Sequence, residues 1–178
     1  MIQHEKNYFE LLGVSASFDL DVAVLSENYR AVQRALHPDR FANSSEKERR
    51  LSVQHAARIN DAYNTLKSPL LRSVYLLGLR GVDVQIESNA NMAPAFLMEQ
   101  MELREALDDA AMAGSTDQVQ TLLEQIDARE RQLHKELSAG FEENSDAALQ
   151  RVALNVRKLQ FFSKLKHDAE QVEAQLDE

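Results

Sequence analysis

The chain has 178 residues, of which 44% are hydrophobic, enough for one medium domain or two small ones. It contains no cysteine, which excludes disulfides, thiolate metal sites and cysteine nucleophiles, and its five glycines and three prolines disfavour a turn-rich β fold. The net charge of −9 divides into +2 over residues 1–80 and −11 over residues 81–178, which predicts two modules with different partners and argues against nucleic acid as a ligand. The abundance of Ala, Leu, Glu, Gln and Arg favours an all-α fold.

The chain is predicted to begin with a short element followed by a long helix. An aromatic and apolar stretch at residues 7–12, closed by Gly13, predicts one or two helical turns. An amphipathic helix follows, with Asp19 or Asp21 as the candidate N-cap. Its apolar side chains recur at helical spacing, namely Leu25, Tyr29, Val32 and Leu36.

A second long helix is predicted behind Ser45, which has the capping-box spacing to Glu48. It should stop before Pro69, and a short helix over about residues 70–79 should end at Gly81. The two long helices, joined by one loop, must then be antiparallel neighbours.

The loop between these helices contains the tripeptide His37-Pro38-Asp39. Pro38 cannot continue a helix, and it pushes His37 toward an extended conformation. An imidazole and a carboxylate are therefore displayed at the tip of a helical hairpin, which is a common place for function. The alternative is a surface loop whose histidine and aspartate only cap the helices.

Residues 81–93 are polar, have no clear period and are interpreted as a linker. Three more helices are predicted, over about residues 94–114, over residues 116–139 with a stop at Gly140, and from about residue 145 onward. Three long helices with short connections indicate an antiparallel bundle.

The first bundle helix has two stripes. One is suited to the core and consists of Phe96, Leu103, Leu107 and Ala110. The other combines a methionine with carboxylates and is flanked by further apolar side chains: Met98, Glu102, Glu105 and Asp109, with Leu97 and Met101 beside them. Exposed clusters of Leu and Met invite association, and methionine adapts easily to a partner. Phe161 falls off the core stripe of the last helix, so we expect it to extend this exposed patch.

The alternative for this second stripe is that Leu97 and Met101 pack inside the bundle and that the carboxylates are only solvated. No catalytic, metal or cofactor site is predicted, because the five histidines are scattered and no Gly-rich phosphate loop or nucleophile arrangement occurs. Residues 1–7 are polar, and no apolar run approaches the roughly 20 residues that span a bilayer. We therefore expect a cytoplasmic protein.

With the tripeptide between two antiparallel helices, the N-terminal unit resembles the J-domain of the DnaJ family. The match to that family's first helix rests on Tyr8, Phe9, Leu11, Leu12 and Gly13. The match to its third and fourth helices rests on Asn60, Ala62, Tyr63, Leu66, Arg72 and Tyr75. The segments FLMEQMELREALDD (96–109) and VRKLQFFSKL (156–165) are similar to the C-terminal domain of the HscB family, the J-domain co-chaperones of bacterial iron–sulfur cluster assembly.

The J-domain resemblance implies that the loop docks onto an ATP-bound, HscA-like chaperone of the DnaK class and favours ATP hydrolysis by that partner. The chain would then be an activator and not an enzyme. The implied chaperone-binding residues are His37, Pro38, Asp39, Arg40, Arg34 and Arg30. Among them, Asp39 can accept charge-assisted hydrogen bonds from a partner arginine, and Pro38 lowers the ordering cost of binding.

The HscB resemblance implies that the second stripe binds an IscU-like iron–sulfur scaffold protein. The implied contacts are Leu97, Met98, Met101, Glu102, Glu105, Asp109 and Phe161, with Asp109 standing where glutamate is expected. The organisation would be a J-domain over residues 1–80, a linker over 81–93 and a client-binding three-helix domain over 94–178. A helical adaptor without effect on any ATPase remains the alternative.

Overall fold

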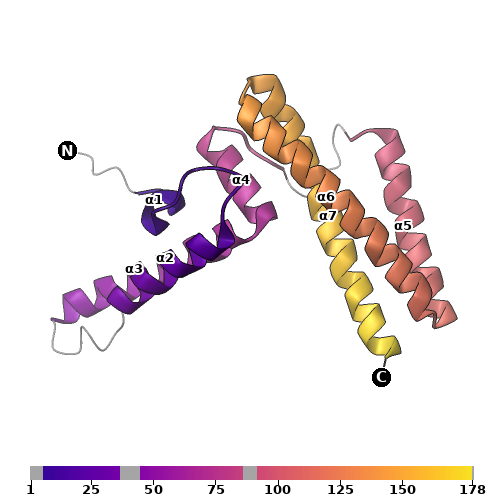
Figure 1. Cartoon of the computed structure of the whole chain (residues 1–178), viewed down its shortest axis with the longest axis horizontal. Coiled ribbons are helices and arrows are strands. Elements are labelled where there is room, and N and C mark those ends of the chain that lie inside the picture. Colours follow the sequence, from indigo (N-terminus) through magenta and orange to yellow (C-terminus); the bar gives the residue numbers. More distant parts are fainter. Residues whose placement is uncertain (1–5, 37–44, 86–91, 178) are drawn as a thin grey trace. The chain divides into compact units, whose positions relative to one another are not determined.

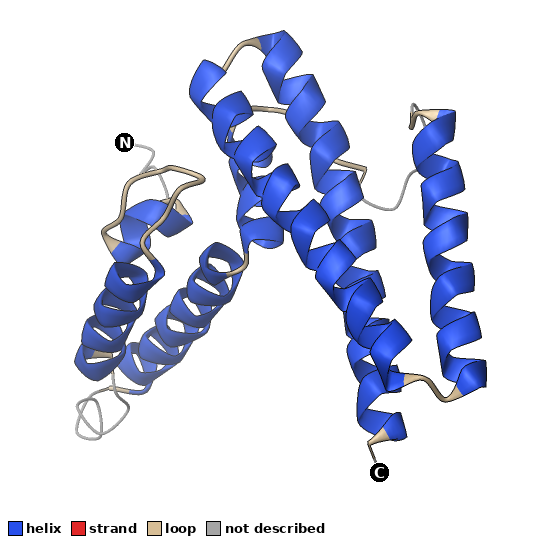
Figure 2. Ribbon diagram, turned by 45° about the vertical axis from the view of Figure 1, so that its right-hand side comes forward, coloured by secondary structure: helices blue, strands red, loops and turns tan. Residues whose placement is uncertain are grey.

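The computed structural model describes residues 6–36, 45–85 and 92–177, and in these ranges every regular element is a helix (Figures 1 and 2). The contacts divide the chain into two units, Met1–Leu76 and Leu77–Glu178. The helices are α1 Tyr8–Leu12, α2 Val22–Ala35, α3 Glu46–Lys67, α4 Pro69–Leu79, α5 Pro94–Ala113, α6 Thr116–Glu143 and α7 Asp146–Leu176. The predicted all-α fold is confirmed.

Side-chain caps set the beginnings of the first helices. Asn7 and Glu10 form a reciprocal capping box at α1, where the Glu10 amide donates to Asn7 Oδ1 at 3.0 Å and the Asn7 amide donates to Glu10 Oε2 at 2.8 Å. Of the two aspartates considered for α2, Asp21 is the N-cap, since its Oδ1 accepts from the amides of residues 23 and 24. The capping box of Ser45 with Glu48 is present at α3 as predicted.

Helices α2 and α3 form the antiparallel hairpin. The rings of Tyr29 and Tyr63 stack with centroids 4.1 Å apart, and Tyr29 Oη donates to Asn60 Oδ1 at 2.9 Å. Nearer the start of α2, the hydroxyls of Ser26 and Tyr63 lie 3.1 Å apart. The earlier of the two α2 residues, Ser26, contacts the later α3 residue, Tyr63, whereas Tyr29 bonds to Asn60. The two helices therefore run in opposite directions.

Helices α1 and α4 brace this hairpin. The Tyr8 and Tyr75 rings stack at 4.5 Å, and the Tyr8 amide donates to Tyr75 Oη at 2.9 Å. Asn28 Nδ2 of α2 donates to the Leu12 carbonyl at 2.9 Å. The core of the unit is apolar and consists of Phe9, Leu12, Phe18, Leu25, Ile59, Ala62, Leu66 and Leu76.

Arg72 of α4 is a buried cation inside the same unit, with 5% of its surface exposed. Its guanidinium carbon lies 5.4 Å from the centroid of the Phe18 ring, in the connection between α1 and α2. Burial lowers the pKa of Arg72, and the charge of Asp19 opposes that shift. Arg72 therefore has a structural role, holding the connection before α2.

In the second unit, α6 and α7 are the long antiparallel pair (Figure 2). Polar contacts join them at intervals along their length. The donors and acceptors are Asn155 with Glu136 (2.9 Å), Ser163 with Glu130 (3.0 Å) and Lys166 with Asp127 (2.6 Å). As the residue number on α7 rises from 155 to 166, the number of its partner on α6 falls from 136 to 127, so one antiparallel register holds over this stretch.

Helix α6 does not stop at Gly140, and the sequence-based boundary there is wrong. It continues to Glu143, and Asn144, with φ 51°, is the left-handed C-cap. Gly140 is instead a point of close helix approach: a Cβ built on it would lie 2.4 Å from Val152 Cγ2 of α7. The sequence alone could not distinguish a terminating glycine from one that packs.

Three phenylalanines fasten α5 to α7. Phe96 of α5 lies with its centroid 5.9 Å from that of Phe161 and 6.1 Å from that of Phe162, and the latter two lie 5.3 Å apart. All three are buried. Edge-to-face and tilted arrangements of this kind stabilise beyond the burial of area.

The segment interpreted as a polar linker contributes two buried side chains where it is described. Val84 and Met92 are each 8% exposed. Both belong by contacts to the second unit.

The close approach at Gly140 generates a test. We expect Gly140→Ala to destabilise the protein by about 1–3 kcal/mol, because a new methyl must displace Val152 and overpack the α6–α7 contact. Urea unfolding followed by circular dichroism measures this. Gly78→Ala is the matched control: Gly78 is helical with nothing within 4 Å of its Cβ position, and the change there should not destabilise. Equal stability of the two variants would contradict the packing role.

The aromatic cluster generates a second test. Phe161→Ala should lower the free energy of unfolding by about 3–5 kcal/mol, because it opens a cavity against Phe96 and Phe162. Met98→Ala, at a site 61% exposed, should change it by less than about 0.5 kcal/mol. The same unfolding measurement compares them, and a small loss at Phe161 would mean that the ring is not part of the core.

Candidate functional site

The tripeptide region lies outside the described residues, and this holds for His37, Pro38, Asp39 and Arg40. The structure describes the helices on either side of this region: α2 ends at Ala35, and α3 begins at Glu46. Because α2 and α3 are antiparallel, these two helix ends lie at the same end of the hairpin.

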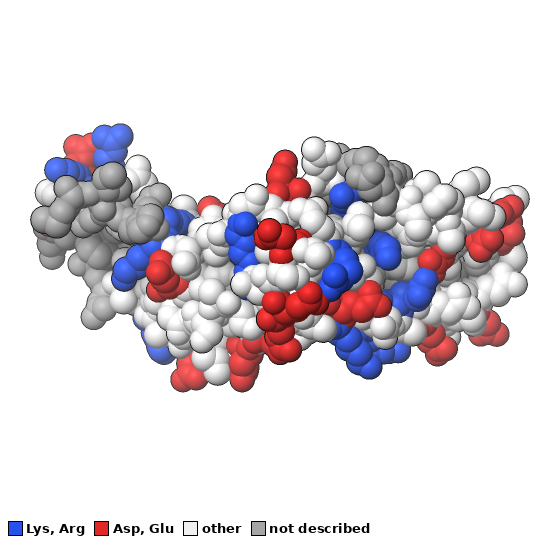
Figure 3. All heavy atoms as spheres, turned by 90° about the horizontal axis from the view of Figure 1, so that it is seen from above, with Lys and Arg blue, Asp and Glu red and all other residues white. Residues whose placement is uncertain are grey.

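That end of the hairpin is rich in cations. Arg30 and Arg34 are exposed on α2, one turn apart, as the sequence indicated. Figure 3 shows several Lys and Arg side chains on the α2–α3 hairpin. The first turns of α3 add exposed cations that sequence reasoning did not select, namely Lys47, Arg49 and Arg50. The sequence run KERR at residues 47–50 could have indicated a cationic binding surface, but such a run is equally typical of a solvated helix face.

An acid within this group is already engaged in capping. Glu48 Oε2 accepts hydrogen bonds from the Ser45 hydroxyl at 2.7 Å and from the Ser45 amide at 2.9 Å. These bonds hold the pKa of the Glu48 carboxyl below its ordinary value. The cations around it suit an anionic partner surface, which steers association more than it adds affinity.

The second candidate site is the outer face of α5. Met98 and Met101 are 61% and 71% exposed, so Met101 does not pack inside the bundle. Leu97 is half-buried and lies at the edge of this face. The predicted carboxylates Glu102, Glu105 and Asp109 are all exposed on it. The structure thus brings five of the seven predicted client contacts onto one exposed surface.

Phe161 does not extend that surface, and the expectation that it does is wrong. It is 8% exposed, stands edge-on to Phe96, and has the Arg104 guanidinium carbon 5.5 Å from its centroid. The sequence reading assumed one narrow core stripe on α7. Because α7 is packed by both α6 and α5, its buried face is wider and includes Phe161.

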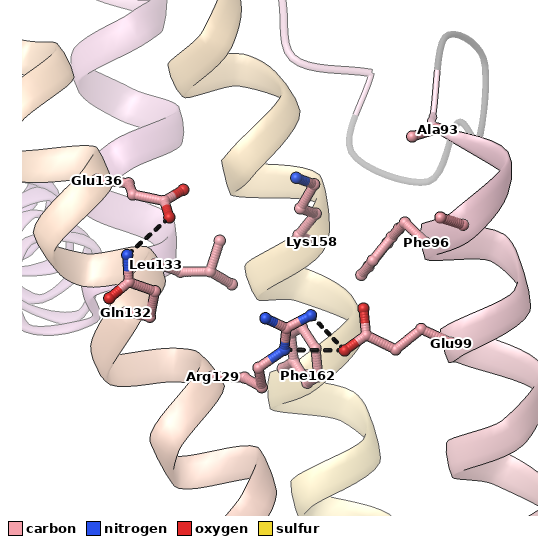
Figure 4. Close-up of a pocket in the computed structure, with 10 residues that line it drawn as sticks. Ala93, Phe96, Glu99, Arg129, Gln132, Leu133, Glu136, Lys158 and Phe162 are labelled. Atoms are coloured by element: carbon pink, nitrogen blue, oxygen red, sulfur yellow. Dashed lines mark hydrogen bonds and ion pairs between the residues drawn. The ribbon is translucent and has the colours of Figure 1, made fainter.

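A groove of about 270 Å³ lies where α5 meets α6 and α7 (Figure 4). Glu99 and Arg129 form an ion pair across it, and Lys158 Nζ lies 5.7 Å from the centroid of the Phe96 ring. The Arg129 guanidinium carbon also lies 5.9 Å from the centroid of Phe162. These contacts hold the first half of α5 against the pair behind it, which leaves the outer face directed at solvent.

The described residues hold no group of three or more His, Asp or Glu side chains that could bind a metal ion. Among the helices described, none is long and apolar enough to cross a membrane.

Comparisons with known proteins agree with this architecture. The family described as the HSCB C-terminal oligomerisation domain matches residues 92–170, which cover α5, α6 and most of α7. Two co-chaperone protein HscB homologs resemble nearly the whole chain. The one from Shewanella loihica is 45% identical over 94% of this chain and 97% of its own length, and the one from Cupriavidus taiwanensis is 42% identical over 99% and 98%.

Solved structures agree as well. Chaperone HscB from Vibrio cholerae aligns with a TM-score of 0.84 at 42% identity, covering 96% of this chain and 99% of its own. Human co-chaperone protein HscB aligns with a TM-score of 0.88 at 30% identity, covering 95% and 83%. The family match lies within the second unit, whereas the relatives and the solved structures extend over both, and the chain belongs to the HscB family of co-chaperones.

Proposed function

We propose that this co-chaperone stimulates ATP hydrolysis by an HscA-like chaperone of the DnaK class and delivers an IscU-like iron–sulfur scaffold protein to it, assisting iron–sulfur cluster maturation. One observation carries the proposal: the unit that matches the HscB C-terminal family displays methionines among carboxylates on the outer face of α5. A surface of that kind favours a protein partner over a small substrate.

The chaperone side of the proposal uses the hairpin. Asp39 would accept charge-assisted hydrogen bonds from an arginine of the partner, and His37 would offer one donor and one acceptor. Arg30 and Arg34, exposed on α2, would contact the partner or steer its approach. The nucleotide chemistry belongs to the partner in this scheme, so the chain acts as an activator.

The client side uses α5. Met98 and Met101 supply flexible apolar contacts, and Glu102, Glu105 and Asp109 supply charge for a cationic rim on the client. Phe161 acts from behind this surface by holding α5 in place through Phe96.

The chaperone side is tested at the tripeptide. We expect His37→Gln to reduce the stimulated rate of ATP hydrolysis to the chaperone's own basal rate, because the imidazole would contact the partner directly. Steady-state phosphate release by the purified HscA-like chaperone measures this. Circular dichroism should show an unchanged fold. Absence of stimulation by the unaltered chain would remove the activator role and favour a plain helical adaptor.

The client side is tested at α5. We expect Met98→Ala to weaken binding of the purified scaffold protein by about tenfold, the range for truncating a central interface contact. The same variant should stimulate the chaperone fully in the absence of client, because the change lies in the other unit. Isothermal titration calorimetry measures the affinity, and an unchanged value would argue against this face as the client site.

A further inference from the structure

The outer face of α5 includes more residues than the predicted client contacts, and it extends farther along the helix. At 100° per residue, the exposed side chains opposite the core fall within an arc of about 120°. They are Met98, Met101, Glu102, Glu105, Asp108, Asp109 and Met112, and all are exposed. We refer to these seven residues as the methionine–carboxylate stripe.

Met112 lies at the far end of the stripe. It is 87% exposed, the highest value among the large hydrophobic side chains exposed in the described residues. It follows Met101 by eleven residues, so the two lie about 20° apart around the helix and about 17 Å apart along it. Single exposed apolar side chains are ordinary on a protein surface. Three methionines aligned on the face opposite the core form a grouped apolar surface instead, which is typical of an interaction site.

The stripe has charge of one sign only. Four of its seven members are carboxylates, and the one cation of α5, Arg104, is directed at the Phe161 ring. A second copy of the same face would oppose carboxylates to carboxylates, which is unfavourable. The surface that fits is apolar, so that it can cover the methionines, and carries Lys or Arg at its rim.

We propose that Met112 and Asp108 extend the client-binding face to the C-terminal end of α5, so that the scaffold protein is held at two anchors, Met98 with Met101 and Met112. This inference rests on the proposed function and adds the second anchor to it. The rigid helix between the anchors, about 21 Å from Met98 to Met112, fixes their spacing. Specificity then depends on a client whose apolar contacts match that spacing.

The variant Met112→Gln tests the second anchor, because it keeps the length of the side chain and its helix propensity while removing the apolar end. Ala111→Gln is the matched control, since Ala111 is exposed on α5 but about 100° away from Met112. In calorimetric titrations with the purified scaffold protein, Met112→Gln should weaken binding about fivefold or more, whereas Ala111→Gln should change it less than about twofold.

The variant Asp108→Asn tests the charge. It should weaken binding about threefold at low ionic strength and have no effect at high ionic strength, because an exposed charge pair is screened. An equal loss at both ionic strengths would mean that Asp108 does not face a cation of the client.

The outcomes separate the inference from the proposed function. If Met98→Ala weakens binding and Met112→Gln does not, the second anchor is wrong and the client role of α5 stands. If the unaltered chain does not bind the scaffold protein, both fail. If sedimentation shows a dimer that Met112→Gln dissociates and Ala111→Gln does not, the face belongs to a second copy, and the inference is overturned.

Discussion

The packing of α6 against α7 is the contact on which the second unit depends. A single antiparallel register joins the two helices from Asp127–Lys166 to the close approach of Gly140 and Val152. That pair forms the platform to which the Phe96–Phe161–Phe162 cluster attaches α5. With its aromatic side committed to the platform, α5 has only its opposite side available to a partner.

In the first unit, a small number of aromatic contacts hold the α2–α3 hairpin together. The stacked tyrosines of α2 and α3 fix the hairpin, and α1 and α4 brace it through the Tyr8–Tyr75 stack. The buried guanidinium of Arg72 on Phe18 adds a rigid contact to the connection before α2. Each unit therefore exposes charged side chains on long helices that also contribute apolar side chains to the core of the unit.

Much of this architecture could be predicted from the sequence, because helix periodicity and capping chemistry are local. The capping box of Ser45 with Glu48, the proline at the start of α5 and the two stripes of that helix follow from residues within one or two turns. Gly140 and Phe161 could not be placed correctly, since their roles depend on residues of other helices. A glycine at a helix contact resembles a glycine at a helix end, and the width of a buried face is set by the number of neighbours.

The stripe on α5 also has a consequence for the helix that carries it. Carboxylates at i, i+3 and i, i+4 spacing, such as Glu105 with Asp108 and with Asp109, destabilise a helix by about 0.2–0.5 kcal/mol per pair. The repulsion within α5 is tolerated because its aromatic and aliphatic side is packed on the platform. A cationic surface seated on the stripe removes that repulsion, so binding of such a surface and the stability of α5 are thermodynamically linked. The helix would be most resistant to local opening when it is occupied.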